Sequence, residues 1–75
     1  LATEKFGNAL IDLNSAIELD KNNAEAYKLR GAIYFNLKNK GKALPDFLRA
    51  IELNQEYSLE LFDFIEECKK LDNAD

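Results

Sequence analysis

The sequence predicts an all-α fold of about four helices, in which neighbouring helices run antiparallel. Apolar residues recur at helical spacing, three and four residues apart, through most of the 75 residues. Short polar stretches that suit turns separate these segments. One segment near the start of the chain recurs 34 residues later, which indicates stacked similar units.

The first two helices are expected on either side of a polar turn. The first should run from about Glu4 to Leu19, with Thr3 as its candidate N-cap. The second should run from about Ala24 to Leu37, capped by Asn23. The apolar stripe of the first helix consists of Phe6, Leu10, Leu13 and Ile17.

The third helix is expected from about Lys42 to Leu53, after a turn in which Gly41 is free to adopt a positive φ. Pro45 lies inside this segment, where it removes one backbone hydrogen bond and should bend the helix locally. The fourth helix should run from about Ser58, its candidate cap, to Leu71. Its apolar face is expected to consist of Leu61, Phe64, Ile65, Cys68 and Leu71. Cys68 should therefore be mostly buried and slow to react.

The internal repeat relates residues 4–20 to residues 38–54, with eight identities in 17 positions. The identical pairs are Gly7/Gly41, Ala9/Ala43, Leu10/Leu44, Asp12/Asp46, Ala16/Ala50, Ile17/Ile51, Glu18/Glu52 and Leu19/Leu53. Self-similarity at this period is typical of proteins in which each unit buries its apolar face against the next.

Residues 24–57 resemble the tetratricopeptide repeat, whose pattern is W-x2-L-G-x2-Y, then A-x3-F, then P. The pattern is followed by Tyr27, Gly31, Tyr34, Ala43, Phe47 and Ala50, with Tyr27 in place of Trp. Two positions depart from it: Arg30 stands where the family has Leu, and Gln55 stands where it has Pro. The resemblance implies that Arg30 pairs with Asp46 and that this aspartate is structural rather than catalytic.

The resemblance implies a single domain over residues 1–75. The domain would contain the second helix of a preceding repeat at 4–20, a complete repeat at 24–57 and a terminal capping helix at 58–72. A further helix is then expected before residue 1.

Composition excludes several functions. The net charge of −4 disfavours nucleic acid, which needs clustered Lys and Arg, and no apolar run approaches the roughly 20 residues that span a membrane. With no histidine and one cysteine, neither a Ser-His nucleophile nor the usual zinc site can form. We therefore expect no catalytic residue, no metal and no cofactor. The single cysteine favours a reducing, cytoplasmic compartment.

The resemblance implies a protein–protein interaction scaffold, because the first helix of each pair in such arrays lines a concave groove that holds a peptide or a partner helix. For the apolar residues at these groove positions, the alternative interpretation is partial burial between helices. For the charged residues, the alternative is an ordinary solvent-exposed face. The positions carried over to this groove are Glu25, Lys28, Leu29, Ala32, Phe35, Asn36, Phe62, Asp63, Glu66 and Lys69.

Two other uses stay open. The chain could be a structural or oligomerisation spacer without a peptide ligand, or a co-chaperone module that works with repeats outside this segment. Some family members clamp the carboxylate end of chaperone tails. Lys28 matches one lysine of that clamp, but Ala32 stands where the clamp needs Asn, so these residues do not complete it.

The stripe of Phe6, Leu10, Leu13 and Ile17 should be left partly bare, because the helix expected before it is not in the sequence. Burying a large apolar side chain contributes roughly 1.5–3 kcal/mol, and contiguous exposed patches recruit partners. We predict that the chain self-associates through this face, as a two-fold dimer or by exchange of helices. Sedimentation measures this, and Leu13→Glu should disperse the assembly. A clean monomer at high concentration would show that the stripe is already covered.

Overall fold

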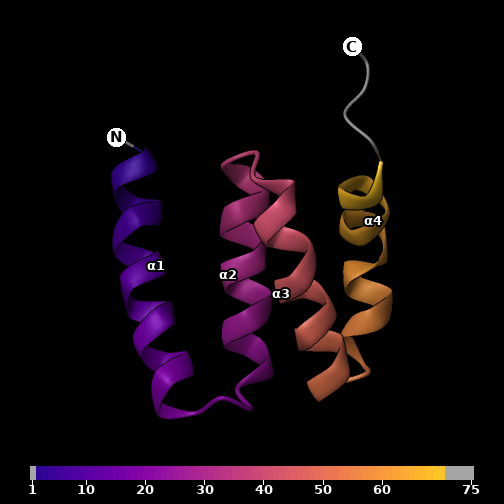
Figure 1. Cartoon of the computed structure of the whole chain (residues 1–75), viewed down its shortest axis with the longest axis horizontal. Helices are drawn as coiled ribbons and strands as arrows, with labels where there is room; N and C mark the ends of the chain where they lie inside the picture. Colours follow the sequence, from indigo (N-terminus) through magenta and orange to yellow (C-terminus); the bar gives the residue numbers. More distant parts are fainter. Residues whose placement is uncertain (1, 71–75) are drawn as a thin grey trace.

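The computed structural model describes the backbone of residues 2–70 and the side chains of residues 5–70. This part of the chain forms four helices, α1 (Ala2–Leu19), α2 (Ala24–Asn36), α3 (Lys40–Leu53) and α4 (Tyr57–Lys69), and contains no strand. Figure 1 shows that consecutive helices run in alternating directions and are joined by short turns. The predicted all-α architecture of antiparallel helices is therefore confirmed.

The helices stack in chain order, with α1 packed on α2, α2 on α3 and α3 on α4 (Figure 1). The molecule measures 39 × 33 × 16 Å, so its thickness is less than two helix diameters of about 10–12 Å. In so thin a stack, a helix is buried only where neighbouring helices meet on it.

The core lies where α3 meets both α2 and α4. Ala43, Phe47 and Ala50 of α3 are fully buried, and Leu61 and Ile65 of α4 pack against them. The rings of Phe35 from α2 and Phe64 from α4 surround Phe47, with centroids 6.4 and 5.6 Å from that of Phe47. Phe35 and Phe64 meet each other edge to face at 5.1 Å, a preferred aromatic geometry. α3 is therefore the central helix of the stack.

The stripe on α1 is partly bare, as the sequence predicts. Ile17 is buried, and Phe6, Leu10 and Leu13 are half-buried, because α1 lays this stripe against α2. The most exposed large apolar side chain of α1 is Leu19, at its C-terminal end.

Asparagine side chains cap the starts of α2 and α3. Asn23 caps α2 as predicted, since its side chain accepts from the N–H of Ala26. The other two predicted caps are wrong, because Thr3 lies inside α1 and Ser58 inside α4. No side chain caps the start of α4. In the turn before it, the side chain of Asn54 accepts from the N–H of Glu56 at 3.0 Å. Leu71, the predicted end of α4 and a member of its predicted apolar face, lies outside the described residues.

The left-handed residue between α2 and α3 is Lys38, with φ 66°, and not Gly41. The N–H groups of Lys38 and Asn39 donate to the carbonyls of Phe35 and Tyr34, at 3.0 and 2.8 Å. This pair of bonds is the Schellman motif, which places a left-handed residue just after the helix and satisfies its last carbonyls.

The position of that motif explains why the prediction for Gly41 was wrong. Asn39 follows the left-handed residue directly and caps α3, accepting from the N–H of Lys42 at 3.2 Å. Helix α3 therefore starts at Lys40, two residues earlier than predicted, and includes Gly41 in its first turn. Pro45 lies further along the same helix, which continues through it as predicted.

Gly31 lies where α2 crosses α3. A Cβ atom at this position would be 2.8 Å from Cδ1 and 2.9 Å from Cε1 of Phe47, and 3.2 Å from Cβ of Asp46. Contacts below about 3 Å are steric clashes in a close-packed interior. The lack of a side chain at Gly31 therefore allows the two helices to approach, as the sequence predicts.

Replacing Gly31 by Leu should lower the free energy of unfolding by about 1–3 kcal/mol, because the new side chain overpacks the α2–α3 contact. Urea denaturation measures the change. The matched control is Gly7→Ala in α1, where a Cβ meets nothing within 4 Å. That variant should raise the free energy of unfolding by up to about 1 kcal/mol, because alanine favours a helix interior. Equal effects of the two variants would contradict the prediction.

Candidate interaction site

The ten predicted groove residues lie on α2 and α4, and most of them face solvent. Leu29 is 43% and Phe62 58% exposed, whereas Lys28, Ala32 and Phe35 are half-buried. The remaining members are exposed: Glu25, Asn36, Asp63, Glu66 and Lys69. The ten residues do not form one site. Some of them line one cleft, others line a second cleft, and the rest line neither.

The first cleft lies between α1 and α2 and has a volume of about 470 Å³. It brings together three predicted groove residues, Leu29, Ala32 and Asn36. Its other lining residues are Ile33 of α2 and Phe6, Ala9, Asp12 and Leu13 of α1. Most of these side chains are apolar, and Asp12 and Asn36 supply the polar groups. A site of this composition suits an apolar ligand surface that a few polar contacts orient.

Sequence reasoning missed the contribution of α1 to this cleft, because the family pattern assigns the groove to the first helix of each pair. The internal repeat held the relevant signal. Ala9, Asp12 and Leu13 correspond to Ala43, Asp46 and Phe47, which are buried between helices.

Lys28 forms contacts with two side chains of the same chain. Its ammonium lies 3.2 Å from a carboxylate oxygen of Glu60 and 4.5 Å from the ring centroid of Tyr57. Both partners belong to α4, so Lys28 links α2 to α4. A carboxylate ligand at Lys28 must compete with Glu60. That competition is mild, since exposed ion pairs contribute about 0–1 kcal/mol.

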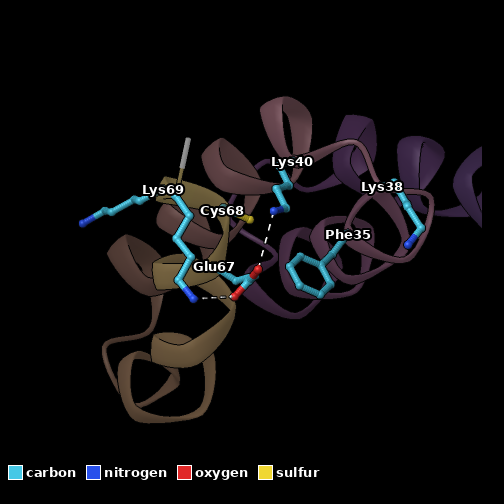
Figure 2. A pocket seen from close by; sticks show the side chains of 7 residues that line it. Phe35, Lys38, Lys40, Glu67, Cys68 and Lys69 are labelled. Atoms are coloured by element: carbon cyan, nitrogen blue, oxygen red, sulfur yellow. Dashed lines mark ion pairs between the residues drawn. The ribbon is translucent and has the colours of Figure 1, made fainter. Parts of the chain in front are cut away.

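The second cleft, of about 540 Å³, lies where the end of α2 and the following turn meet the end of α4 (Figure 2). It is lined by Phe35, Lys38, Lys40, Glu67, Cys68, Lys69 and Lys70. The carboxylate of Glu67 pairs with two lysine ammonium groups, at 3.6 Å from that of Lys40 and 3.2 Å from that of Lys70. Figure 2 marks the pair with Lys40 by a dashed line. Both lysines lower the pKa of Glu67, and Lys70 has the larger effect. Two stretches of the chain, residues 35–40 and 67–70, build this cleft, and no sequence motif marked it.

Cys68 is half-buried at the second cleft and packs against the core, so it is less buried than the sequence predicts. Burial raises the pKa of its thiol. The charge of Lys40 opposes that rise, and the charge of Glu67 adds to it.

Arg30 and Asp46 form a forked ion pair between α2 and α3. The Nε and Nη2 groups of Arg30 each donate to one oxygen of Asp46 at 2.8 Å, and Nη1 donates to Oδ1 of Asn14 on α1 at 2.9 Å. Asp46 is only 6% exposed, and its hydrogen bonds raise the pKa of Arg30. The predicted structural partner of Arg30 is therefore confirmed, and the arginine joins three helices.

Two further findings concern the described residues alone. None of their His, Cys, Asp and Glu side chains cluster in threes that could hold a metal ion. None of the described helices has the length and apolar character needed to cross a membrane.

The fold and the clefts define a helical-repeat module, and comparison with known proteins identifies the repeat. Residues 24–57 match the family model of the tetratricopeptide repeat. Over 45 residues, the chain is 42% identical to "Tetratricopeptide repeat protein 14" of Mus musculus. The aligned segment covers 60% of this chain. The chain spans only 6% of the length of that relative. No solved structure matches. Residues 24–57 are a tetratricopeptide repeat, the repeat of a family of protein–protein interaction modules.

Cys68 should be labelled by a thiol reagent at pH 8 at least about tenfold more slowly in the folded chain than in urea. The reactive form is the thiolate, and a raised pKa leaves less of it at a given pH. Lys40→Gln should slow labelling further, because it removes a cation that lowers the pKa. Lys42→Gln, a neighbour outside the cleft lining, is the matched control. Equal rates in the folded and denatured chain would contradict the prediction.

Proposed function

We propose that the chain is a protein–protein interaction scaffold that binds a peptide or a partner helix in the groove along α2. The observation that carries this proposal is the largely apolar cleft between α1 and α2, where Leu29, Ala32 and Asn36 meet. A tetratricopeptide repeat at residues 24–57 supports the same class of function.

The exposed side chains of this cleft are of the kind that partner proteins cover. Leu29 leaves 43% of its surface in water, beside the half-buried Phe6 and Leu13. Burying such groups stabilises a complex, and an amphipathic helix laid in a groove is a recurring way to do so. Asp12 and Asn36 at the same cleft can fix the orientation of the ligand. In this role the chain uses no catalytic residue.

The co-chaperone alternative has less support. Its carboxylate clamp would use Lys28, which is already paired with Glu60, and Ala32 offers no amide for the second contact. The spacer alternative requires only that the helices stack and needs no ligand. A binding experiment on the cleft therefore distinguishes a spacer from a peptide-binding scaffold. The cytoplasmic location stays a prediction.

A peptide array probed with the labelled chain should show binding that Leu29→Glu weakens at least about tenfold, because the substitution places a charge in an apolar contact. The matched control is Leu59→Glu on α4, since Leu59 is 89% exposed and outside the cleft. Lys28→Ala should reduce binding only to peptides with an acidic end. Absence of any bound peptide, or equal loss in both glutamate variants, would favour the spacer.

A further inference from the structure

We infer that the second cleft, between the turn after α2 and the end of α4, binds an acidic peptide segment of a partner protein. This segment carries an aromatic residue among its carboxylates. The inference goes beyond the proposed function, because it concerns another part of the surface and needs no ligand in the α1–α2 cleft. It rests on the concentration of positive charge at one place of an acidic chain.

Four lysines line the second cleft, together with a single carboxylate. Lys38 and Lys40 belong to one stretch of the chain, and Lys69 and Lys70 to the other. The chain has 10 Lys and Arg residues and a net charge of −4, so a large share of its cations meets at this cleft. A cleft lined by one sign of charge concentrates ligands of the opposite sign. The expected ligand is therefore an anion.

Stabilisation of helix ends explains only part of this concentration. Lys69 and Lys70 lie at the C-terminal end of α4, where cations complement the helix dipole. Lys40, in contrast, is the first residue of α3, whose first turn contains no acidic residue. A cation at a helix N-terminus opposes the positive end of the dipole. Lys40 is thus unfavourable for its own helix, and an anion bound there would relieve both charges.

Glu67 shows that the cleft accepts a carboxylate. Its carboxylate lies 3.6 Å from the ammonium of Lys40, as Figure 2 shows, and 3.2 Å from that of Lys70. Both pairs lie at the surface, since the side chain of Glu67 is 45% exposed. Exposed ion pairs contribute little free energy. A carboxylate of a partner can therefore replace Glu67 or share its lysines.

Lys38 offers a second place for a carboxylate, and Phe35 lies between the two places. Lys38 is exposed, and among residues 5–70 no carboxylate pairs with it. In Figure 2, the half-buried ring of Phe35 lies between Glu67 and Lys38. Charge, ring and charge thus follow one another across the cleft. A peptide with acidic residues on both sides of an aromatic residue matches this order.

The size and surroundings of the cleft favour a peptide over a nucleic acid. Its volume of about 540 Å³ lies in the range of small-ligand sites and admits a few side chains. Outside the cleft, the chain carries an excess of acidic residues. These residues repel a nucleic acid, whose phosphates continue beyond the cleft. A short acidic segment places its charges only where the lysines are.

The test uses the whole chain and the peptide Gly-Glu-Glu-Phe-Glu-Glu-Gly, with a fluorophore at its N-terminus and an amide at its C-terminus. Fluorescence anisotropy should show saturable binding, which added salt weakens because the contacts join exposed charges. Lys38→Gln and Lys40→Gln should each weaken the Kd about fivefold. The matched control is Lys21→Gln, an exposed lysine outside the cleft, which should leave the Kd unchanged.

Removal of the carboxylate already in the cleft should have the opposite effect. Glu67→Gln should strengthen the Kd about threefold, because the peptide no longer competes with Glu67 for its two lysines. The matched control is Glu18→Gln, an exposed glutamate of α1, which changes the net charge equally. A purely structural role of Glu67 predicts no gain in affinity.

Peptide variants test the central ring and the charges. Glycine in place of the phenylalanine should weaken binding, because it removes the contact with Phe35. Glutamine in place of all four glutamates should abolish binding.

Several outcomes would overturn the inference. They are equal affinities of the Glu67→Gln and Glu18→Gln variants, unchanged binding of the glutamine peptide, tighter binding of an oligothymidylate than of the acidic peptide, and no binding at all. Binding that Leu29→Glu removes and Lys40→Gln leaves intact would also overturn it, and would support the proposed function instead. The peptide array tests the α1–α2 cleft separately, so the two proposals can fail independently.

Discussion

The contact of Gly31 with Phe47 sets the distance between α2 and α3, and the rest of the stack is arranged around that distance. Without a side chain at Gly31, the backbone of α2 lies directly on the ring of Phe47. Phe35 of α2 also contacts the ring, Phe64 and α4 enclose it from the other side, and the ring is 0% exposed. A thin stack of four helices has little interior, so one closely packed aromatic ring makes up a large part of its core.

The Arg30–Asp46 pair fixes the orientation at the same crossing. A buried ion pair must offset the cost of removing two charges from water, and it does so only when the geometry is favourable. Here two parallel hydrogen bonds of 2.8 Å provide that geometry, and the arginine keeps part of its surface in solvent. An apolar residue at position 30 would fill space, but it would not specify the rotation of α2 against α3. The departure from the family pattern is thus compatible with the fold because Asp46 accompanies it.

Much of this architecture could be predicted from the sequence, because it depends on residues that contact one another at fixed spacing. Gly31, Phe47 and the Arg30–Asp46 pair belong to this group. The helix starts could be predicted only in part. Asn23 caps α2 as expected, whereas α4 begins at Tyr57, one residue before its expected cap Ser58, and no side chain caps it. Lys38 could not be predicted as the left-handed residue. Gly41 is intrinsically better suited, but the hydrogen bonds at the end of α2 determine the position.

The candidate site was predictable on α2 and not on its neighbours. Leu29, Ala32 and Asn36 were identified by the repeat pattern, which describes the helix that carries them. The α1 side of the cleft depends on how far α1 covers α2, and Lys40 reaches Glu67 of α4 only in the folded chain. Such juxtapositions are properties of the tertiary structure, and no local spacing in the sequence encodes them.

The stacking of helices in chain order also has a consequence for folding. Each main contact joins helices that are consecutive in the sequence, so few long loops must close before the native contacts form, and such topologies fold rapidly. The α2–α3 hairpin contains the most complete packing and can act as the nucleus. Helix α1 packs chiefly on α2 and holds none of the residues that enclose Phe47. Its detachment is therefore a local opening of low free energy, which leaves the remaining helices folded.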